Sequence, residues 1–228
     1  MSELGSSYGA VFQAWRDASP DWDGYTQHAF VEGLRDGSLP RSAFLHYLVQ
    51  DYVFLVHFSR AWALGVVKAE TQEEMQTCAG TVDALVNHEM RLHVGTCAEE
   101  GISEDQLFHA AEEAENLAYT RYVLEAGYSG DYLDLMAALM PCVMGYGEIG
   151  ARLGADNGET QYQPWIDTYS GADYQSMCTA VGAMVDAAVD RRLGSDFRSS
   201  PRWASLSAKF ATATKLEVGF WGMGMRGA

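Results

Sequence analysis

The sequence predicts an all-α chain that folds as a single domain over residues 1–228, and three observations carry the prediction. Apolar residues recur every three or four positions along nearly every segment, and no segment alternates polar and apolar residues as a strand would. With 228 residues and 48% hydrophobic content, the chain can bury a full core. No glycine-, proline- or serine-rich stretch is long enough to link two domains. We therefore expect a bundle of seven or eight helices.

The first long helix is predicted to begin near Pro40 or Arg41. One of its faces carries an apolar stripe interrupted by a carboxylate, namely Phe44, Leu48, Asp51, Leu55, Phe58 and Trp62. Thr71 to Glu74 form a capping-box pattern that begins a second helix, which is expected to run to about Gly101. Its expected buried face comprises Met75, Val82, Leu85 and Leu92. Ser103 to Gln106 repeat the capping pattern and predict a shorter helix.

The C-terminal half predicts four more helices, over about residues 114–126, 131–153, 170–193 and 201–223. The last of them begins well, because Ser200 can cap it and Pro201 stands in its first turn. Loops are expected at 36–40, 127–130 and 154–158, where glycines gather.

The charge balance limits the possible partners. A formal net charge of −16 disfavours binding to a nucleic-acid backbone or to an anionic membrane surface. The N-terminus lacks a signal-peptide pattern, and the longest apolar runs are too short to span a bilayer. The four cysteines, Cys78, Cys97, Cys142 and Cys178, have neither metal-binding nor disulfide-framework spacing. We therefore predict a cytoplasmic protein.

Cys142 is the candidate nucleophile. On a helix it lies one turn before Tyr146, so the thiol and the phenol share a face. Gly145 is expected to leave a gap beside them, and Pro141 to start or kink the helix at this point. The alternative is that Cys142 is an inert buried residue, which is the usual state of a free cysteine and the interpretation we give to the other three.

Two acidic residues lie on apolar faces. Asp51 interrupts the stripe of the first long helix, and Glu217 lies among Phe210, Phe220 and Trp221. A buried carboxylate is costly unless it is paired, and burial can tune it for acid–base work. The alternatives are that Asp51 faces solvent and that Glu217 is a surface residue near Lys215 or Arg226.

The histidines predict no metal site. His88, Glu89 and His93 cluster on the second helix, but a di-iron bundle requires two Glu-x-x-His motifs and two further carboxylates. Only one imperfect copy is present, which favours a solvated polar face. The cluster nevertheless leaves open a non-haem iron oxidase as an alternative enzyme.

Five segments together resemble the thiaminase II (TenA-type) family. They are the runs that begin at His28 (HAFVEGLRDGSL), Tyr47 (YLVQDYVFL), Met140 (MPCVMGYGE), Trp165 (WIDTY) and Glu217 (EVGFWGM). Each motif alone is weak, but all five occur in the family's order across nearly the whole chain.

The resemblance implies a haem-oxygenase-like helical bundle, a homotetramer and a role in thiamine salvage. The implied reaction converts 4-amino-5-aminomethyl-2-methylpyrimidine, or thiamine itself, to 4-amino-5-hydroxymethyl-2-methylpyrimidine. It implies no metal and no organic cofactor. A non-catalytic pyrimidine-binding protein is the alternative from outside the enzyme classes.

The resemblance also assigns roles to individual residues. Cys142 matches the nucleophile that adds to the pyrimidine ring, Glu217 the acid/base, and Asp51 the carboxylate that binds the aminopyrimidine edge. The matched substrate-contacting aromatic residues are Tyr119, Tyr146 and Tyr169. Phe54 offers a flat aromatic face but stands where some members carry a tyrosine whose hydroxyl sharpens the nucleophile.

Overall fold

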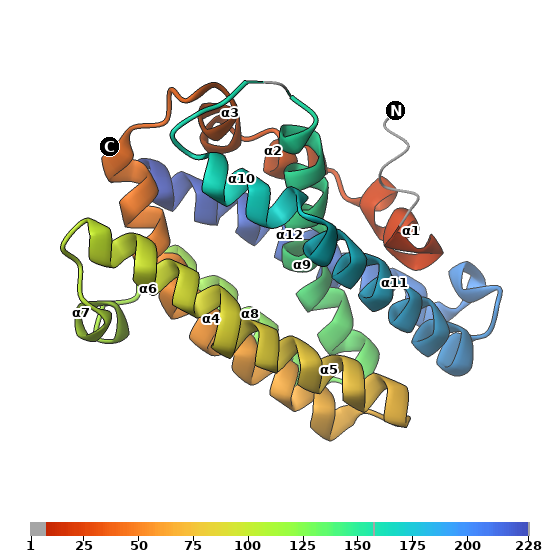
Figure 1. Ribbon diagram of the computed structural model, residues 1–228. Helices are drawn as coiled ribbons and strands as arrows, with labels where there is room; N and C mark the ends of the chain where they lie inside the picture. The colour runs from red at the N-terminus through yellow and green to blue at the C-terminus, as the bar shows by residue number, and fades with distance from the viewer. Residues whose placement is uncertain (1–7, 157, 228) are drawn as a thin grey trace. The chain divides into compact units, whose positions relative to one another are not determined.

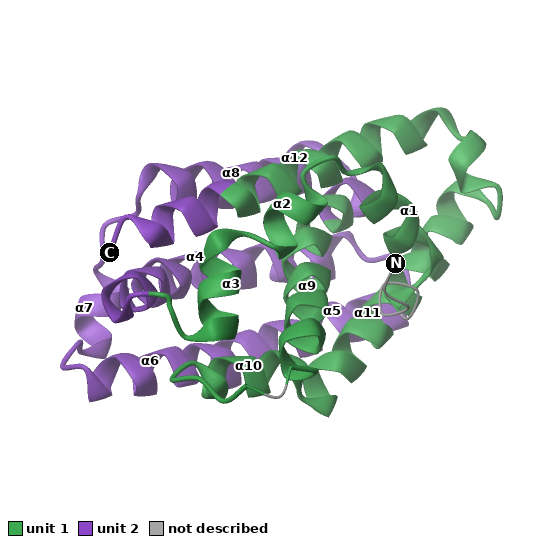
Figure 2. Cartoon of the chain, turned by 90° about the horizontal axis from the view of Figure 1, so that it is seen from above, with its two compact units in different colours: residues 1–39, 136–218 green, residues 40–135, 219–228 purple. Residues whose placement is uncertain are grey.

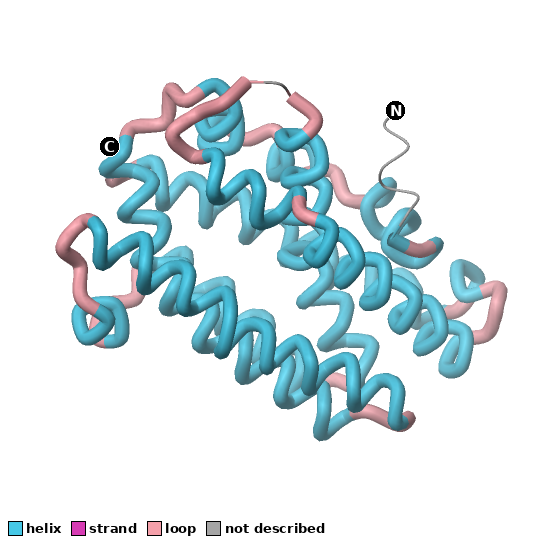
Figure 3. The backbone as a smooth tube through the Cα atoms, viewed as in Figure 1, coloured by secondary structure: helices cyan, strands magenta, loops and turns pink. Residues whose placement is uncertain are grey.

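The structure, a computed structural model, describes residues 8–156 and 158–227 (Figure 1). These residues form helices and connecting loops, with no strand among them (Figure 3). The prediction of an all-α chain is therefore confirmed. The α-helices are α1 (Ala10–Ala18), α2 (Trp22–Thr26), α3 (Ala29–Asp36), α4 (Arg41–Lys68), α5 (Gln72–Ala84), α6 (Met90–Glu99), α7 (Glu104–Phe108), α8 (Ala114–Ser129), α9 (Tyr132–Gly154), α10 (Gln163–Ser170), α11 (Ala172–Leu193) and α12 (Pro201–Met225).

The chain divides into two compact units (Figure 2). Unit 1 comprises residues 1–39 and 136–218, and unit 2 comprises residues 40–135 and 219–228. Helices α9 and α12 each contribute residues to both units. The single-domain organisation stays a prediction.

In unit 1, aromatic stacking and a partly buried ion pair fix the N-terminal helix α1. Trp15 stacks on Trp203 and on Phe210 of α12, with 5.6 Å between ring centroids in both pairs. The Arg16 guanidinium donates two hydrogen bonds to Glu148 of α9, at 2.7 and 2.9 Å. Such a two-pronged pair fixes both distance and orientation, so α1 is firmly placed against the helix that carries Cys142.

In unit 2, α4 is the central helix, and α5, α6 and α8 pack against it, as the ribbon of Figure 1 shows. Its predicted stripe is confirmed, since every member from Phe44 to Trp62 is buried. The helix also buries residues outside the stripe, among them Gln50 and Phe54. A helix that is buried on several sides is surrounded by other helices, so polar side chains of α4 such as Gln50 also point into the protein interior.

The second predicted helix is interrupted by a π-helical segment, Leu85–Glu89, between α5 and α6. In a continuous α-helix Leu92 would share the face of Leu85, but the wider turn shifts the positions that follow by one residue. Leu92 is accordingly 55% exposed and His93 is buried in its place. The expectation that Leu92 belongs to the core was wrong for this reason, and Met75 is also exposed.

The predicted helix starts are largely confirmed. Ser103 and Gln106 form the complete capping box that begins α7. Thr71 caps α5 through the Glu74 amide, but the Glu74 carboxylate accepts from the Glu70 amide rather than from Thr71, so that box is only half formed. The last helix begins at Pro201 as expected.

Four short helices were not predicted: α1, α2, α3 and α10. Helix α8 runs on to Ser129, so most of the loop expected at 127–130 is helical. Pro141 lies inside α9 rather than at its start, and the helix continues through it. None of the helices in the described part of the chain combines the length and apolar character that a membrane span requires.

Candidate functional site

The predicted site residues fall into two groups by unit. Unit 1 carries Cys142 and Tyr146 on α9, Tyr169 on α10 and Glu217 on α12, and unit 2 carries Asp51 and Phe54 on α4 and Tyr119 on α8. All of these side chains are buried except Cys142, which is half-buried.

Cys142 and Tyr146 share a face of α9, as the four-residue spacing predicts. The Tyr146 ring packs against Tyr169 of α10, with 5.0 Å between centroids and an interplanar angle of 61°. It also contacts Trp165, at 5.9 Å between centroids. The structure thus brings together two predicted substrate-binding tyrosines, one of which, Tyr146, lies one turn from the candidate nucleophile Cys142 on α9.

The gap expected beside Gly145 is filled. A Cβ atom at Gly145 would lie 2.1 Å from Cε1 and 2.5 Å from the hydroxyl of Tyr25 on α2. Tyr25 is fully buried, and its hydroxyl donates to the Pro141 carbonyl at 3.3 Å. The glycine therefore admits a core tyrosine against α9, and the expectation of an open pocket at this position was wrong.

The three remaining thiols are placed as inert core residues. Cys78, Cys97 and Cys178 are all buried. Burial raises the pKa of Cys97 to about 11 and that of Cys178 to about 12. It also raises the pKa of Cys78, against a lowering contribution from the hydrogen bond to Tyr132. Since the thiolate is the nucleophilic form, these residues are unreactive near neutral pH.

Glu217 lies on α12 and is 2% exposed. Neighbouring positions on the same helix, Phe210 and Thr214, are fully buried. Arg226, one of the surface partners considered for it, instead forms ion pairs with Glu113 and Glu115. The alternative of a surface glutamate is therefore wrong.

Asp51 is also buried, at 3% exposure, so the alternative of a solvent-facing carboxylate is wrong. The Tyr47 hydroxyl, one turn earlier on α4, donates to Oδ2 of Asp51 at 3.1 Å. His93 Nε2 of α6 lies 2.6 Å from the same oxygen. Burial tends to lower the pKa of His93, but the hydrogen bond and charge of Asp51 outweigh it and the pKa is raised overall.

One turn after Asp51, Phe54 lies in an aromatic cluster. Its ring centroid is 5.0 Å from that of Tyr119 on α8, 5.2 Å from that of Phe58 and 5.4 Å from that of Phe220. The structure therefore brings together Asp51, Phe54 and Tyr119, the three predicted site residues of unit 2. A carboxylate beside aromatic faces suits a flat ring with hydrogen-bond donors.

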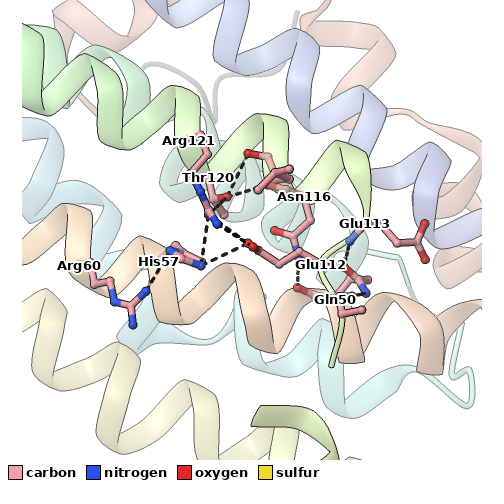
Figure 4. A network of polar contacts seen from close by, with 10 residues as sticks. Gln50, His57, Arg60, Glu112, Glu113, Asn116, Thr120 and Arg121 are labelled. Atoms are coloured by element: carbon pink, nitrogen blue, oxygen red, sulfur yellow. Dashed lines mark hydrogen bonds and ion pairs between the residues drawn. The ribbon is translucent and has the colours of Figure 1, made fainter. Parts of the chain in front are cut away.

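A network of polar contacts attaches α8 to α4 next to Asp51 (Figure 4). Gln50 donates to the Ala111 carbonyl at 2.9 Å and accepts from the Glu113 amide at 3.1 Å. Asn116, fully buried on α8, donates to the Gln50 carbonyl at 2.7 Å. Because these contacts join Gln50 of α4 to Asn116 and to the Glu113 amide before α8, they set the position of the helix that carries Tyr119.

Figure 4 also shows a second cluster that includes His57, Glu112 and Arg121. Arg121 forms an ion pair with Glu112 at 2.7 Å, and His57 Nε2 lies 3.2 Å from the other carboxylate oxygen. Burial, followed by the positive charge of Arg121, lowers the pKa of His57. This cluster holds the segment before α8 against α4.

The residues considered for iron do not converge. His88 is exposed, whereas both ring nitrogens of buried His93 have polar partners, Asp51 and the Glu89 carbonyl. Within residues 8–156 and 158–227, no three His, Cys, Asp or Glu side chains are grouped so that they could hold a metal ion. The interpretation of the whole cluster as a solvated face was wrong for His93, which is buried and paired with Asp51.

Comparison with known proteins supports one family. A sequence profile of the TENA/THI-4/PQQC family matches residues 15–227. An aminopyrimidine aminohydrolase of Halalkalibacterium halodurans is 34% identical over 212 residues, which cover 92% of each chain. Another, of Bacillus subtilis, is 29% identical over 208 residues, which cover 90% of this chain and 85% of that protein.

A solved structure gives the same answer. A TenA family transcription regulator from Silicibacter sp. TM1040 is 64% identical, with a TM-score of 0.94 over 96% of this chain and 98% of that one. With the sequence profile and the curated relatives in agreement, the chain belongs to the TENA/THI-4/PQQC family.

Proposed function

We propose that this protein is a hydrolase of thiamine salvage that acts on 4-amino-5-aminomethyl-2-methylpyrimidine and releases ammonia and the hydroxymethyl product. The observation that carries the proposal is the placement of a half-buried Cys142 one turn before Tyr146, whose ring packs on Tyr169. Relatives named aminopyrimidine aminohydrolase at 29–34% identity support the reaction class.

In the proposed mechanism, the Cys142 thiolate adds to the pyrimidine ring and makes it electron-rich. The ring then expels the amine from the adjacent methylene carbon, and Glu217 supplies the proton with which it leaves as ammonia. Water adds to the methylene carbon, the thiolate departs, and Glu217 takes back a proton. A positioned acid/base of this kind contributes about 10²–10⁴-fold to the rate.

Recognition of the ring is assigned to the residues of unit 2. Asp51 accepts a hydrogen bond from the exocyclic amine, and Phe54 and Tyr119 offer aromatic faces to the flat ring. Phe54 has no hydroxyl to activate a thiol, so we expect slower turnover than in family members that carry tyrosine there. Thiamine is the second candidate substrate, and its thiazolium would leave as a neutral thiazole without needing a proton.

The remaining expectations belong to the same proposal. We expect a cytoplasmic homotetramer that works without a metal or an organic cofactor. The iron oxidase alternative has less support, because His88 is exposed whereas His93 is buried against Asp51. The pyrimidine-binding alternative predicts tight binding of the hydroxymethyl product without turnover.

The test is ammonia release from the aminomethylpyrimidine by Cys142→Ser, compared with Cys78→Ala as the control. The serine variant is expected to lose activity by at least about 10³-fold, because an alcohol is far less ionised than a thiol at neutral pH. The Cys78→Ala variant removes a buried thiol of the core and keeps activity. Near-wild-type turnover by Cys142→Ser would refute the proposal, and product binding without turnover by the wild type would favour the binding protein.

A further inference from the structure

His93 and Asp51 form a buried pair whose protons can be assigned from their contacts. His93 Nδ1 lies 3.0 Å from the Glu89 carbonyl oxygen, which can only accept, so Nδ1 carries a hydrogen. Nε2 lies 2.6 Å from Asp51 Oδ2, and a separation this short between two such atoms requires a proton between them. The pair therefore holds one shared proton and is neutral as a whole.

Neutrality explains why two titratable side chains can be buried here. His93 is 5% exposed and Asp51 is 3% exposed. An uncompensated charge at such a position would be expensive, whereas an imidazolium against a carboxylate compensates both charges. The raised pKa of His93, which results from Asp51 and Glu89 in spite of burial, favours the charged form of the ring.

The two oxygens of Asp51 are not equivalent. Both hydrogen bonds that it receives from described residues, from Tyr47 and from His93, go to Oδ2. Oδ1 accepts none from the described part of the chain. It is therefore the oxygen that is left to accept a hydrogen bond from a ligand.

We propose that His93 is a positioning residue for Asp51: it holds Oδ2 and compensates the carboxylate charge, so that Oδ1 is free to accept a hydrogen bond from the amino group of the aminopyrimidine. The inference rests on the proposed function for the identity of this ligand. The π-helical segment Leu85–Glu89 supports it, because the wide turn places His93 on the face toward α4 and supplies the Glu89 carbonyl that holds Nδ1.

The experiment compares three variants, His93→Ala, His93→Gln and the control His88→Gln, which changes an exposed histidine of the same segment. Isothermal titration calorimetry measures the Kd of the hydroxymethylpyrimidine product, and steady-state assays separate KM from kcat. His93→Ala is expected to raise KM and Kd by about 10- to 100-fold. Its kcat should change by less than about threefold, because Cys142 and Glu217 are untouched.

The glutamine variant tests the hydrogen bond apart from the charge. Its amide can donate a hydrogen bond to Oδ2 but carries no positive charge. We therefore expect its Kd for the product to lie between those of the wild type and His93→Ala. His88→Gln should bind as the wild type does. The inference fails if His93→Ala binds the product with wild-type Kd, or if kcat falls while KM and Kd stay unchanged.

A measurement that does not depend on the His93→Ala variant keeps the inference testable if that variant does not fold. NMR of the full-length protein labelled with ¹⁵N-histidine reports the protonation of both ring nitrogens. At pH 7.5 we expect His93 to carry protons on both nitrogens, and to lose one in Asp51→Asn. A neutral His93 in the wild type would refute the inference. This spectrum does not require turnover. A protein without activity would therefore overturn the proposed function, while the protonation of the His93–Asp51 pair could still be measured.

Discussion

Replacement of Gly145 by alanine should destabilise the protein, although alanine is the better helix former. The added Cβ would lie 2.1 Å from Cε1 of Tyr25, whereas ordinary van der Waals contact begins at 3.4 Å. The ring would have to retreat by about 1.3 Å to restore contact distance. It has little room, since Tyr25 is fully buried and its ring packs edge-on against Trp22 at 5.6 Å.

The magnitude follows from two opposing effects. Overpacking of a well-filled core costs about 1–3 kcal/mol, and an overlap this large belongs at the upper end. Alanine recovers about 1 kcal/mol over glycine inside a helix. The net loss is about 2 kcal/mol, which for a chain of this size lowers Tm by about 4–8 °C.

Gly80→Ala provides the matched control. Gly80 lies in the interior of α5, and a Cβ there would meet nothing within 4 Å. This variant should gain up to about 1 kcal/mol and unfold about 2–4 °C higher. Differential scanning calorimetry compares both variants with the wild type. A double variant that adds Tyr25→Ala to Gly145→Ala should lose less stability than the two single changes together.

The outcome that refutes this reasoning is a Gly145→Ala protein that melts at or above the wild-type temperature. Such a result would mean that Tyr25 does not occupy the space beside Gly145. The position next to Cys142 would then be open, as the sequence alone led us to expect.

Three further predictions concern accessibility and anchoring. At pH 8 an aromatic disulfide reagent should react with about one thiol in the folded chain and with four after unfolding. Burial and the raised thiol pKa values protect the cysteines other than Cys142, so Cys142→Ser should abolish the fast reaction. Asp186 accepts the amides of Ala10 and Val11 at 2.9 and 2.8 Å, so Asp186→Ala should cost about 1–2 kcal/mol in urea unfolding, and an unchanged midpoint would contradict its role as a cap for α1. Glu148→Gln keeps the side-chain shape but removes the charge that faces Arg16, and should lower the free energy of unfolding by about 1–3 kcal/mol. The loss should be the same in high salt, because the ion pair is largely buried and salt screens it little.

The sequence was a good guide where local chemistry decides the structure. The stripe from Phe44 to Trp62 identified α4, and the box at Ser103 identified α7, because periodicity and capping depend on residues close along the chain. Helices of five to nine residues, such as α1 and α2, were not predicted, because one or two turns are too short to reveal a hydrophobic periodicity.

Parts of the candidate site could not be predicted from local patterns. Asp51 and Glu217 stood out because carboxylates are rare on apolar faces, and both are buried. Tyr25 gave no sign that it fills the space beside Gly145, because the two positions are far apart along the chain. The partner of Asp51 was likewise hidden, since no propensity rule signals the wide turn that precedes His93.

That wide turn also determines which changes of length the protein can tolerate. His93 stands eight positions after Leu85, whereas two turns of an α-helix take about 7.2 residues. The π-helical segment absorbs the surplus residue, much as a β-bulge does in a strand. Deletion of one residue there, for example exposed Asn87, would convert the π-helical segment to regular α-helix and still leave His93 facing α4. The same loss between the segment and His93 would be absorbed as well, whereas a deletion after His93 would rotate every later position of α6, Cys97 included, by about 100° around the helix axis.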